Sequence, residues 1–300
     1  TFSFSFIIIL SYYKVICIII TKKTIKSANA ILILSSHLFG LLYYEYSIDY
    51  KRQIAYNASN QYHYYQKGGK IMRVNNRYVS FYYENDMDMG EIKIEPEKTA
   101  LLIIDMQHVF ITRPVLENPT PEDLAEAERW EPFYSKIDSV VVPNNQRILQ
   151  AFRERNMNVC FAKIQCQKKD GSDRSLDQKA TGYNELLLPP GTPSAEIVSE
   201  LEPLDDEIVV TKTTDSVLAG TSLRLWLNNM GIDTVVVTGV LTDQCVSGTV
   251  RSLADESFKV WLIEDACMAS TQKIQDNELE ILNNIYCHVI NTDELIEALS

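Results

Sequence analysis

The chain has 300 residues, a formal net charge of −12 at pH 7 and 46% hydrophobic residues. This is the composition of an ordinary globular protein, and the length suits one large domain or two small ones. The acidic part of the chain contains no stripe of Lys and Arg. We therefore expect no binding of nucleic acid through a basic face.

The first 71 residues differ from the rest of the chain. They carry eight Lys and Arg against two acidic residues, whereas all ten prolines lie after residue 71. Their apolar runs, Phe4–Ile20 and Ala28–Tyr44, fall short of the roughly 20 clean apolar residues of a spanning helix. We interpret residues 1–71 as a non-native or disordered upstream extension, with a membrane hairpin as the alternative.

Five cysteines follow residue 71, at scattered positions between Cys160 and Cys287. An odd, scattered set in a domain of this size indicates a reducing compartment and not a disulfide framework. We therefore expect a cytoplasmic protein without a membrane partner.

Residues 72–96 are polar and aromatic without a clear period, and we expect an N-terminal arm there. In residues 97–300, short apolar runs alternate with helical patterns. Near-continuous apolar strands that alternate with helices predict an α/β domain with a parallel sheet covered on both faces. The predicted strands are Ala100–Ile104, Val159–Ile164, Glu207–Thr211, Thr234–Val240, Lys259–Ile263 and Tyr286–Ile290.

The predicted helices lie between these strands. Leu218–Met230 places Leu223, Trp226 and Leu227 on one stripe and ends at a glycine suited to a C-cap. Residues 112–143 form a long connection rich in Pro, Glu and aromatic residues, which predicts a lid or an oligomer contact. The other predicted helices are Asn144–Arg155, Pro193–Glu200, Cys245–Glu256, Thr271–Asn284 and Thr292–Leu299.

Three reactive side chains follow predicted strands. Asp105 and Lys212 come directly after buried strands, and Cys245 follows Thr234–Val240 after a short turn. Ligands of such folds bind at the carboxyl ends of strands, so the three side chains can meet in one crevice. There a carboxylate can take the thiol proton, while an ammonium and a helix start favour the thiolate. The alternatives are a structural ion pair and a buried packing cysteine.

Four motifs in this order resemble the isochorismatase-like cysteine hydrolases. They are Leu102–Gln107, Lys212–Thr221, Gly231–Val246 and Glu264–Cys267, and the resemblance covers about residues 97–299. It implies a three-layer α/β/α fold with a Rossmann-like, six-stranded parallel sheet. It also implies a homo-dimer or homo-tetramer.

The same resemblance implies the roles of individual residues. It places a catalytic triad at Asp105, Lys212 and Cys245, and a non-proline cis peptide at Val240–Leu241. The backbone N–H groups of Leu241 and Cys245 would form an oxyanion hole.

Departures from related enzymes narrow this interpretation. Nicotinamidases of the superfamily carry an Asp-x-His metal site after the second strand, where this chain reads Ala162–Gln167 without Asp or His. Only His108 and His288 occur after residue 71, so we expect neither a metal site nor a cofactor. Isochorismatases proper lack the cysteine, so Cys245 argues against hydrolysis of a vinyl ether.

Four further residues are candidates for binding substrate. Gln107 and Phe110 lie just past Asp105, and Gln165 ends the second strand. Thr242 lies in the turn before Cys245, where capping the turn is the alternative role.

Together these patterns predict a metal-independent cysteine amidohydrolase. Its substrate would be a small amide, carbamoyl or ureido compound, cleaved at a C–N bond through a thioester. The alternatives are a nicotinamidase-type hydrolase of pyridine carboxamides and a non-catalytic protein that binds a small molecule on the same fold.

Overall fold

The computed structural model describes residues 5–11, 14–20, 77–84, 94–180 and 186–300. The chain divides into two compact units, Thr1–Lys70 and Ile71–Ser300. The described part of the first unit is an antiparallel pair of strands, β1 (Ser5–Ser11) and β2 (Lys14–Ile20). The remaining residues of the predicted extension, and residues 72–76 and 85–93 of the expected arm, lie outside the described residues.

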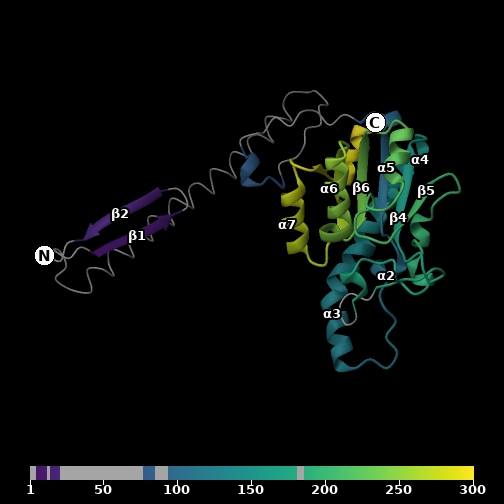
Figure 1. Cartoon of the computed structure of the whole chain (residues 1–300), viewed down its shortest axis with the longest axis horizontal. Coiled ribbons are helices and arrows are strands. Elements are labelled where there is room, and N and C mark those ends of the chain that lie inside the picture. The colour runs from purple at the N-terminus through teal and green to yellow at the C-terminus, as the bar shows by residue number, and fades with distance from the viewer. Residues whose placement is uncertain (1–4, 12–13, 21–76, 85–93, 181–185) are drawn as a thin grey trace. The chain divides into compact units, whose positions relative to one another are not determined.

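The second unit contains the predicted six-stranded parallel sheet, which confirms the fold class (Figure 1). Its strand order is β5-β4-β3-β6-β7-β8, and every neighbouring pair is parallel. β3 and β6 are the two central strands, so their carboxyl ends lie in the middle of the carboxyl edge of the sheet. The strands are β3 (Thr99–Ile104), β4 (Asn158–Ile164), β5 (Ile208–Lys212), β6 (Thr234–Val240), β7 (Lys259–Met268) and β8 (His288–Ile290).

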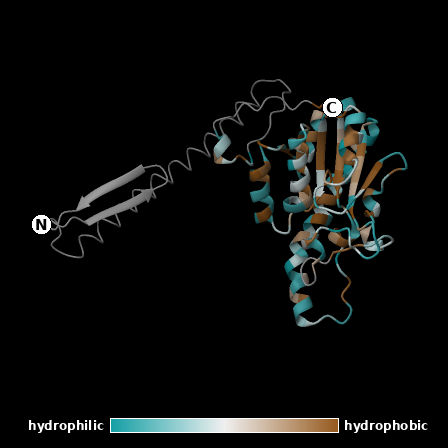
Figure 2. Cartoon of the chain, viewed as in Figure 1, coloured by the Kyte–Doolittle hydropathy of each residue, from teal (hydrophilic) through white to brown (hydrophobic). Residues whose placement is uncertain are grey.

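Alternate residues of the central strands point into two separate cores, as the period of two in a strand requires. Leu101 and Ile103 of β3 join Phe152 of α4 in one core, and Leu102 joins Val250 of α6 in the other. Figure 2 shows the apolar strands between polar outer surfaces of the helices. One face is covered by α4 (Val142–Glu154) and α8 (Thr292–Ala298), the other by α5 (Leu223–Asn229), α6 (Ser247–Asp255) and α7 (Gln272–Leu282).

The described residues of the expected arm contact the domain. The Arg77 guanidinium lies 2.5 Å from a Glu264 carboxylate oxygen and 2.9 Å from one of Glu294. The Asn283 side chain donates a hydrogen bond of 2.6 Å to the carbonyl of Tyr78. In the described part of the chain, no helix is long and apolar enough to cross a membrane.

Two predicted segments differ from the structure. The long connection 112–143 contains the helix α3 (Pro121–Lys136), which continues through a π-helical turn, Ile137–Val141, into α4. Thr120 and Asp123 begin α3 with a capping box, which the prolines and the polar composition of the segment concealed. The predicted helix Pro193–Glu200 is instead two short 3-10 turns, because residues 196–198 adopt extended backbone.

A third difference is the length of α5, which begins at Leu223 and not at the predicted Leu218. Its inner stripe holds Leu223 and Leu227, whereas Trp226 is 40% exposed. The residues between β5 and α5 form a loop. This loop contains most of the second sequence motif, Lys212–Thr221, and lies beside the site.

Gly239, near the end of β6, lets the backbones of β6 and β3 approach each other closely. Its φ is +111°, and a Cβ at this position would overlap the backbone of Ile104. Because Ile104 directly precedes Asp105 and Gly239 precedes the turn to Cys245, this contact fixes the separation of two candidate site residues.

We predict that Gly239→Ala lowers the free energy of unfolding by at least about 3 kcal/mol, because neither backbone can move without breaking the central strand pair. Gly191→Ala is the matched control: Gly191 also has positive φ (+86°), but an added Cβ there would meet no atom within 4 Å. Its cost is about 1 kcal/mol, from backbone strain alone. Urea unfolding of both variants measures the difference, and equal losses would contradict the role of the close approach.

Candidate active site

Asp105 is placed by the end of β3. It is 1% exposed and has a φ of +50°, a left-handed conformation that is uncommon outside glycine. Its N–H donates to the carbonyl of Ala162 on β4 (2.9 Å), and its own carbonyl accepts from the N–H of Gln107 (2.7 Å). These bonds hold the strained backbone and turn the carboxylate inward.

Lys212, the last residue of β5, is also 1% exposed. Its Nζ lies 2.7 Å from Oδ2 of Asp105 and donates to Sγ of Cys245 over 3.2 Å. A third bond, of 3.2 Å, goes to the carbonyl of Thr214. The ammonium therefore bridges a carboxylate and a thiol in the dry interior, where removing one charge would leave the other unpaired.

Cys245 lies in a π-helical turn, Thr242–Val246, that leads directly into α6. Its side chain is near the start of that helix, as the sequence predicts, and it is 6% exposed. The hydroxyl of Thr249 donates to the carbonyl of Cys245 (2.6 Å) and so braces the turn. The structure thus brings Asp105, Lys212 and Cys245 together from three different strands.

The electrostatics of the site differ from the sequence-based expectation that the free thiol favours its thiolate. Burial, followed by the charge of Asp105, raises the pKa of the Cys245 thiol well above its usual range, against the opposing effect of Lys212. Burial also raises the pKa of Asp105, again against Lys212. Burial alone would lower the pKa of Lys212, but Asp105 and Cys245 raise it above the ordinary value. These directions favour a protonated sulfur and a charged Lys212.

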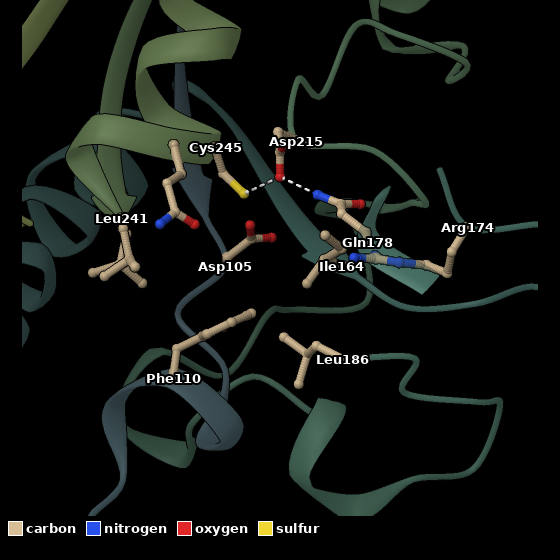
Figure 3. A pocket seen from close by; sticks show the side chains of 11 residues that line it. Asp105, Phe110, Ile164, Arg174, Gln178, Leu186, Asp215, Leu241 and Cys245 are labelled. Atoms are coloured by element: carbon tan, nitrogen blue, oxygen red, sulfur yellow. Dashed lines mark hydrogen bonds between the residues drawn. The ribbon is translucent and has the colours of Figure 1, made fainter. Parts of the chain in front are cut away.

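Asp105 and Cys245 line a cavity of about 360 Å³, the size of a site for a small ligand, whereas Lys212 lies behind them and is not part of its wall. Figure 3 shows Asp105 and Cys245 at its centre, with Arg174, Gln178 and Asp215 opposite Leu241. The cavity is lined by Asp105, Phe110, Ile164, Arg174, Gln178, Leu186, Asp215, Val240, Leu241, Gln244 and Cys245.

Asp215 is a second carboxylate at the sulfur, and the sequence analysis did not identify it. The Cys245 thiol donates to its Oδ1 over 3.7 Å, and Nε2 of Gln178 donates to the same oxygen over 2.6 Å. The signal for it was present in the sequence, because Asp215 stands three residues after Lys212 within a quoted motif.

Of the four substrate-binding candidates, only Phe110 lines the cavity. Gln107 is completely buried, and its amide binds three backbone groups: it donates to the carbonyls of Ile164 (3.0 Å) and Ala195 (2.7 Å) and accepts from the N–H of Ile164 (2.8 Å). The prediction for Gln107 is therefore corrected: its amide ties the end of β4 to the loop around residue 195.

Gln165 and Thr242 also lie outside the cavity wall. Gln165 is 8% exposed and donates to the carbonyl of Pro189 (3.3 Å), because β4 turns its side chain toward that loop. Thr242 is fully buried at the first position of the π-helical turn, where its side chain faces the protein. Their contact with substrate stays a prediction.

The peptide bond between Val240 and Leu241 is cis, at the position that the resemblance implies. The carbonyl of Leu241 accepts from the N–H groups of Gln244 (3.0 Å) and Val246 (3.3 Å). Leu241 lines the cavity, and among the described residues no acceptor binds its own N–H. This part of the chain also holds no group of three His, Cys, Asp or Glu side chains arranged for a metal ion.

Comparison with known proteins identifies the class to which this fold and site belong. Residues 99–294 match the isochorismatase domain, so the chain belongs to the isochorismatase family of hydrolases.

Individual relatives are distant but cover most of this domain. The N-carbamoylsarcosine amidase of an Arthrobacter species is 28% identical over 59% of this chain and 69% of its own length. The ureidoacrylate amidohydrolase of Serratia proteamaculans is 25% identical over 70% of this chain and 86% of its own. A solved isochorismatase family protein from Desulfovibrio vulgaris covers 67% of this chain and 98% of its own length, with a TM-score of 0.54 and 28% identity.

We predict that substitutions at the ion pair move the thiol pKa in opposite directions. Asp105→Asn removes a charge that raises the pKa of Cys245, so alkylation by iodoacetamide becomes faster at neutral pH. Lys212→Gln removes the charge that lowers this pKa, so alkylation becomes slower. Mass spectrometry of the Cys245 peptide as a function of pH measures both.

Asp206→Asn is the matched control for this experiment. Asp206 is exposed and precedes β5, at the opposite end of that strand from Lys212. In the Asp206→Asn variant, alkylation of Cys245 should depend on pH as it does in the unmodified protein. Slower alkylation in Asp105→Asn would show that the carboxylate does not raise the pKa of Cys245.

Proposed function

We propose that this protein is a metal-independent cysteine amidohydrolase that cleaves a C–N bond of a small amide, carbamoyl or ureido compound. The observation that carries the proposal is one continuous contact: Asp105 Oδ2 to Lys212 Nζ at 2.7 Å, and Lys212 Nζ to Cys245 Sγ at 3.2 Å, beside a cavity for a small ligand. The names of two relatives, an N-carbamoylsarcosine amidase and a ureidoacrylate amidohydrolase, agree with this chemistry.

In the proposed mechanism, Asp105 takes the proton of Cys245 as the sulfur attacks the carbonyl carbon. Because burial raises the pKa of the thiol, we assign this proton transfer to the same step as the attack. Asp105, now neutral, gives the proton to the departing ammonia or amine. A water molecule then hydrolyses the thioester, with Asp105 again as the base.

Lys212 keeps its charge through this sequence, since its two partners raise its pKa. It stabilises the sulfur when the sulfur is anionic and holds the Asp105 carboxylate beside it. The scheme uses no metal, because the ammonium supplies the positive charge that the thiolate requires.

The backbone N–H groups of Leu241 and Cys245 would bind the oxyanion of the tetrahedral intermediate. Leu241 supports this role because it lines the cavity on the side away from Asp215 (Figure 3). An N–H directed at the developing charge acts strongly in a dry site, where no reorganisation of water is needed.

We predict that Cys245→Ala lowers the release of ammonia from a small amide by on the order of a thousandfold or more. The panel is ureidoacrylate, biuret, N-carbamoyl amino acids, maleamate and nicotinamide, each assayed with the full chain. Cys160→Ala is the matched control, because Cys160 is a buried free cysteine near the start of β4, away from the cavity. Cys160→Ala should retain activity, whereas activity that persists in Cys245→Ala would disprove the covalent scheme.

A second prediction concerns the acid limb of the pH profile. Asp105 must be ionised to take the thiol proton, and burial raises its pKa. Activity should therefore fall, as the pH is lowered, at a higher pH than about 3.9, the value of an ordinary aspartate. The measurement is kcat/KM against pH, with circular dichroism at each point to exclude acid unfolding. An acid limb at the ordinary value would contradict Asp105 as the base.

A further inference from the structure

The wall of the cavity contains a buried cation without an ionic partner. Arg174 is 4% exposed, and its Nε and Nη1 atoms have no hydrogen-bond partner among the residues that the structure describes. No ion pair in that part of the chain includes it. A buried guanidinium without a partner is costly, so an anionic group of a ligand is the natural complement.

The loop that carries Arg174 is held by its own backbone bonds. The Asp173 carboxylate accepts from the N–H groups of Gln167 (2.6 Å) and Lys168 (3.2 Å), and the N–H of Arg174 donates to the carbonyl of Gly171 (3.1 Å). These bonds close the loop without using the guanidinium. The side chain therefore faces the cavity as a preformed binding group.

A second charged group on the same wall has the opposite sign. Oδ1 of Asp215 accepts hydrogen bonds from the Gln178 amide and the Cys245 thiol. Among the described residues, no donor binds its Oδ2. Figure 3 shows Asp215 beside the sulfur and Arg174 farther along the wall. No ion pair joins Arg174 to the exposed Asp215, so each charge is available to a different group of one ligand.

We propose that Asp215 and Arg174 together recognise the part of the substrate beyond the scissile carbonyl, with Asp215 accepting an N–H next to that carbonyl and Arg174 binding a carboxylate. This inference rests on the proposed function and names its substrate class: an N-carbamoyl amino acid whose retained nitrogen carries a hydrogen. The negative charge of Asp215 at the sulfur also repels a carboxylate that enters in the reverse orientation.

The chemistry of such a substrate is consistent with the positions of the two aspartates. The Cys245 sulfur forms a bond to the carbamoyl carbon, the C–NH₂ bond breaks, and ammonia leaves with the proton from Asp105. The retained N–H stays on the acyl group and faces Asp215, while the carboxylate stays at Arg174. Water then cleaves the C–S bond, and the thiolate regains its proton.

The test measures binding to the full-chain Cys245→Ala protein by isothermal titration calorimetry, so that no turnover interferes. N-carbamoylglycine is compared with N-carbamoylglycinamide, which lacks the carboxylate charge. It is also compared with succinamate, in which CH₂ replaces the N–H, and with N-carbamoylsarcosine, in which the nitrogen is methylated. We expect N-carbamoylglycine to bind about ten- to a hundredfold more tightly than each of the three, as for hydrogen bonds to charged groups.

Substitutions in the same background assign each preference to one side chain. Arg174→Gln should remove the preference for the carboxylate and keep the preference for the N–H, whereas Asp215→Ala should do the reverse. Lys169→Gln, which removes an exposed positive charge from the same loop, is the matched control and should keep both. Arg174→Lys keeps the charge and should retain part of the carboxylate preference, which separates recognition from a folding defect.

The inference is wrong if none of the four compounds binds, or if either preference survives the substitution assigned to it. A failure of the proposed function gives a different result. In that case N-carbamoylglycine binds with the expected preferences, but the protein with Cys245 intact releases no ammonia from it.

Discussion

The buried ion pair between Asp105 and Lys212 is the interaction on which the site depends. Both residues are 1% exposed, and among the described residues the ion pairs of Asp105 and Lys212 join them only to each other, while Lys212 also donates to the sulfur of Cys245. Two charges in a dry interior are stable only when their geometry is held closely, and removing either one leaves the other uncompensated. The fold meets this requirement by placing the partners at the ends of β3 and β5, which are fixed by parallel hydrogen bonding through β4. The reactive sulfur is added from the neighbouring central strand, β6.

Burial and one member of this pair raise the pKa of the Cys245 thiol. Burial and the Asp105 carboxylate favour the neutral sulfur, while Lys212 opposes them. In the mechanism that we propose, the nucleophile is therefore generated when a carbonyl group lies against the sulfur and Asp105 accepts the proton.

The cavity wall opposite Leu241 carries two charged side chains that come from loops. Arg174 and Asp215 come from the loop after β4 and the loop after β5, and neither is neutralised by the other. Loops at the carboxyl ends of parallel strands vary without disturbing the sheet, so they can alter recognition while the Asp105, Lys212 and Cys245 contacts remain unchanged. In our proposals the chemistry therefore lies at strand ends and the recognition on loops.

The sequence by itself determined the parallel sheet and the convergence of Asp105, Lys212 and Cys245. Apolar runs such as Thr234–Val240 report burial directly, and a residue that follows a parallel strand must lie at the carboxyl edge. Only the tertiary structure decided which polar residues enter the cavity. Gln107 follows a strand as Asp105 does, yet its amide is used by the backbone of a distant loop, whereas Asp215 and Arg174 reach the cavity from segments without a strong period. The raised thiol pKa was also undetermined by the sequence, because it depends on burial and on charges brought from separate strands.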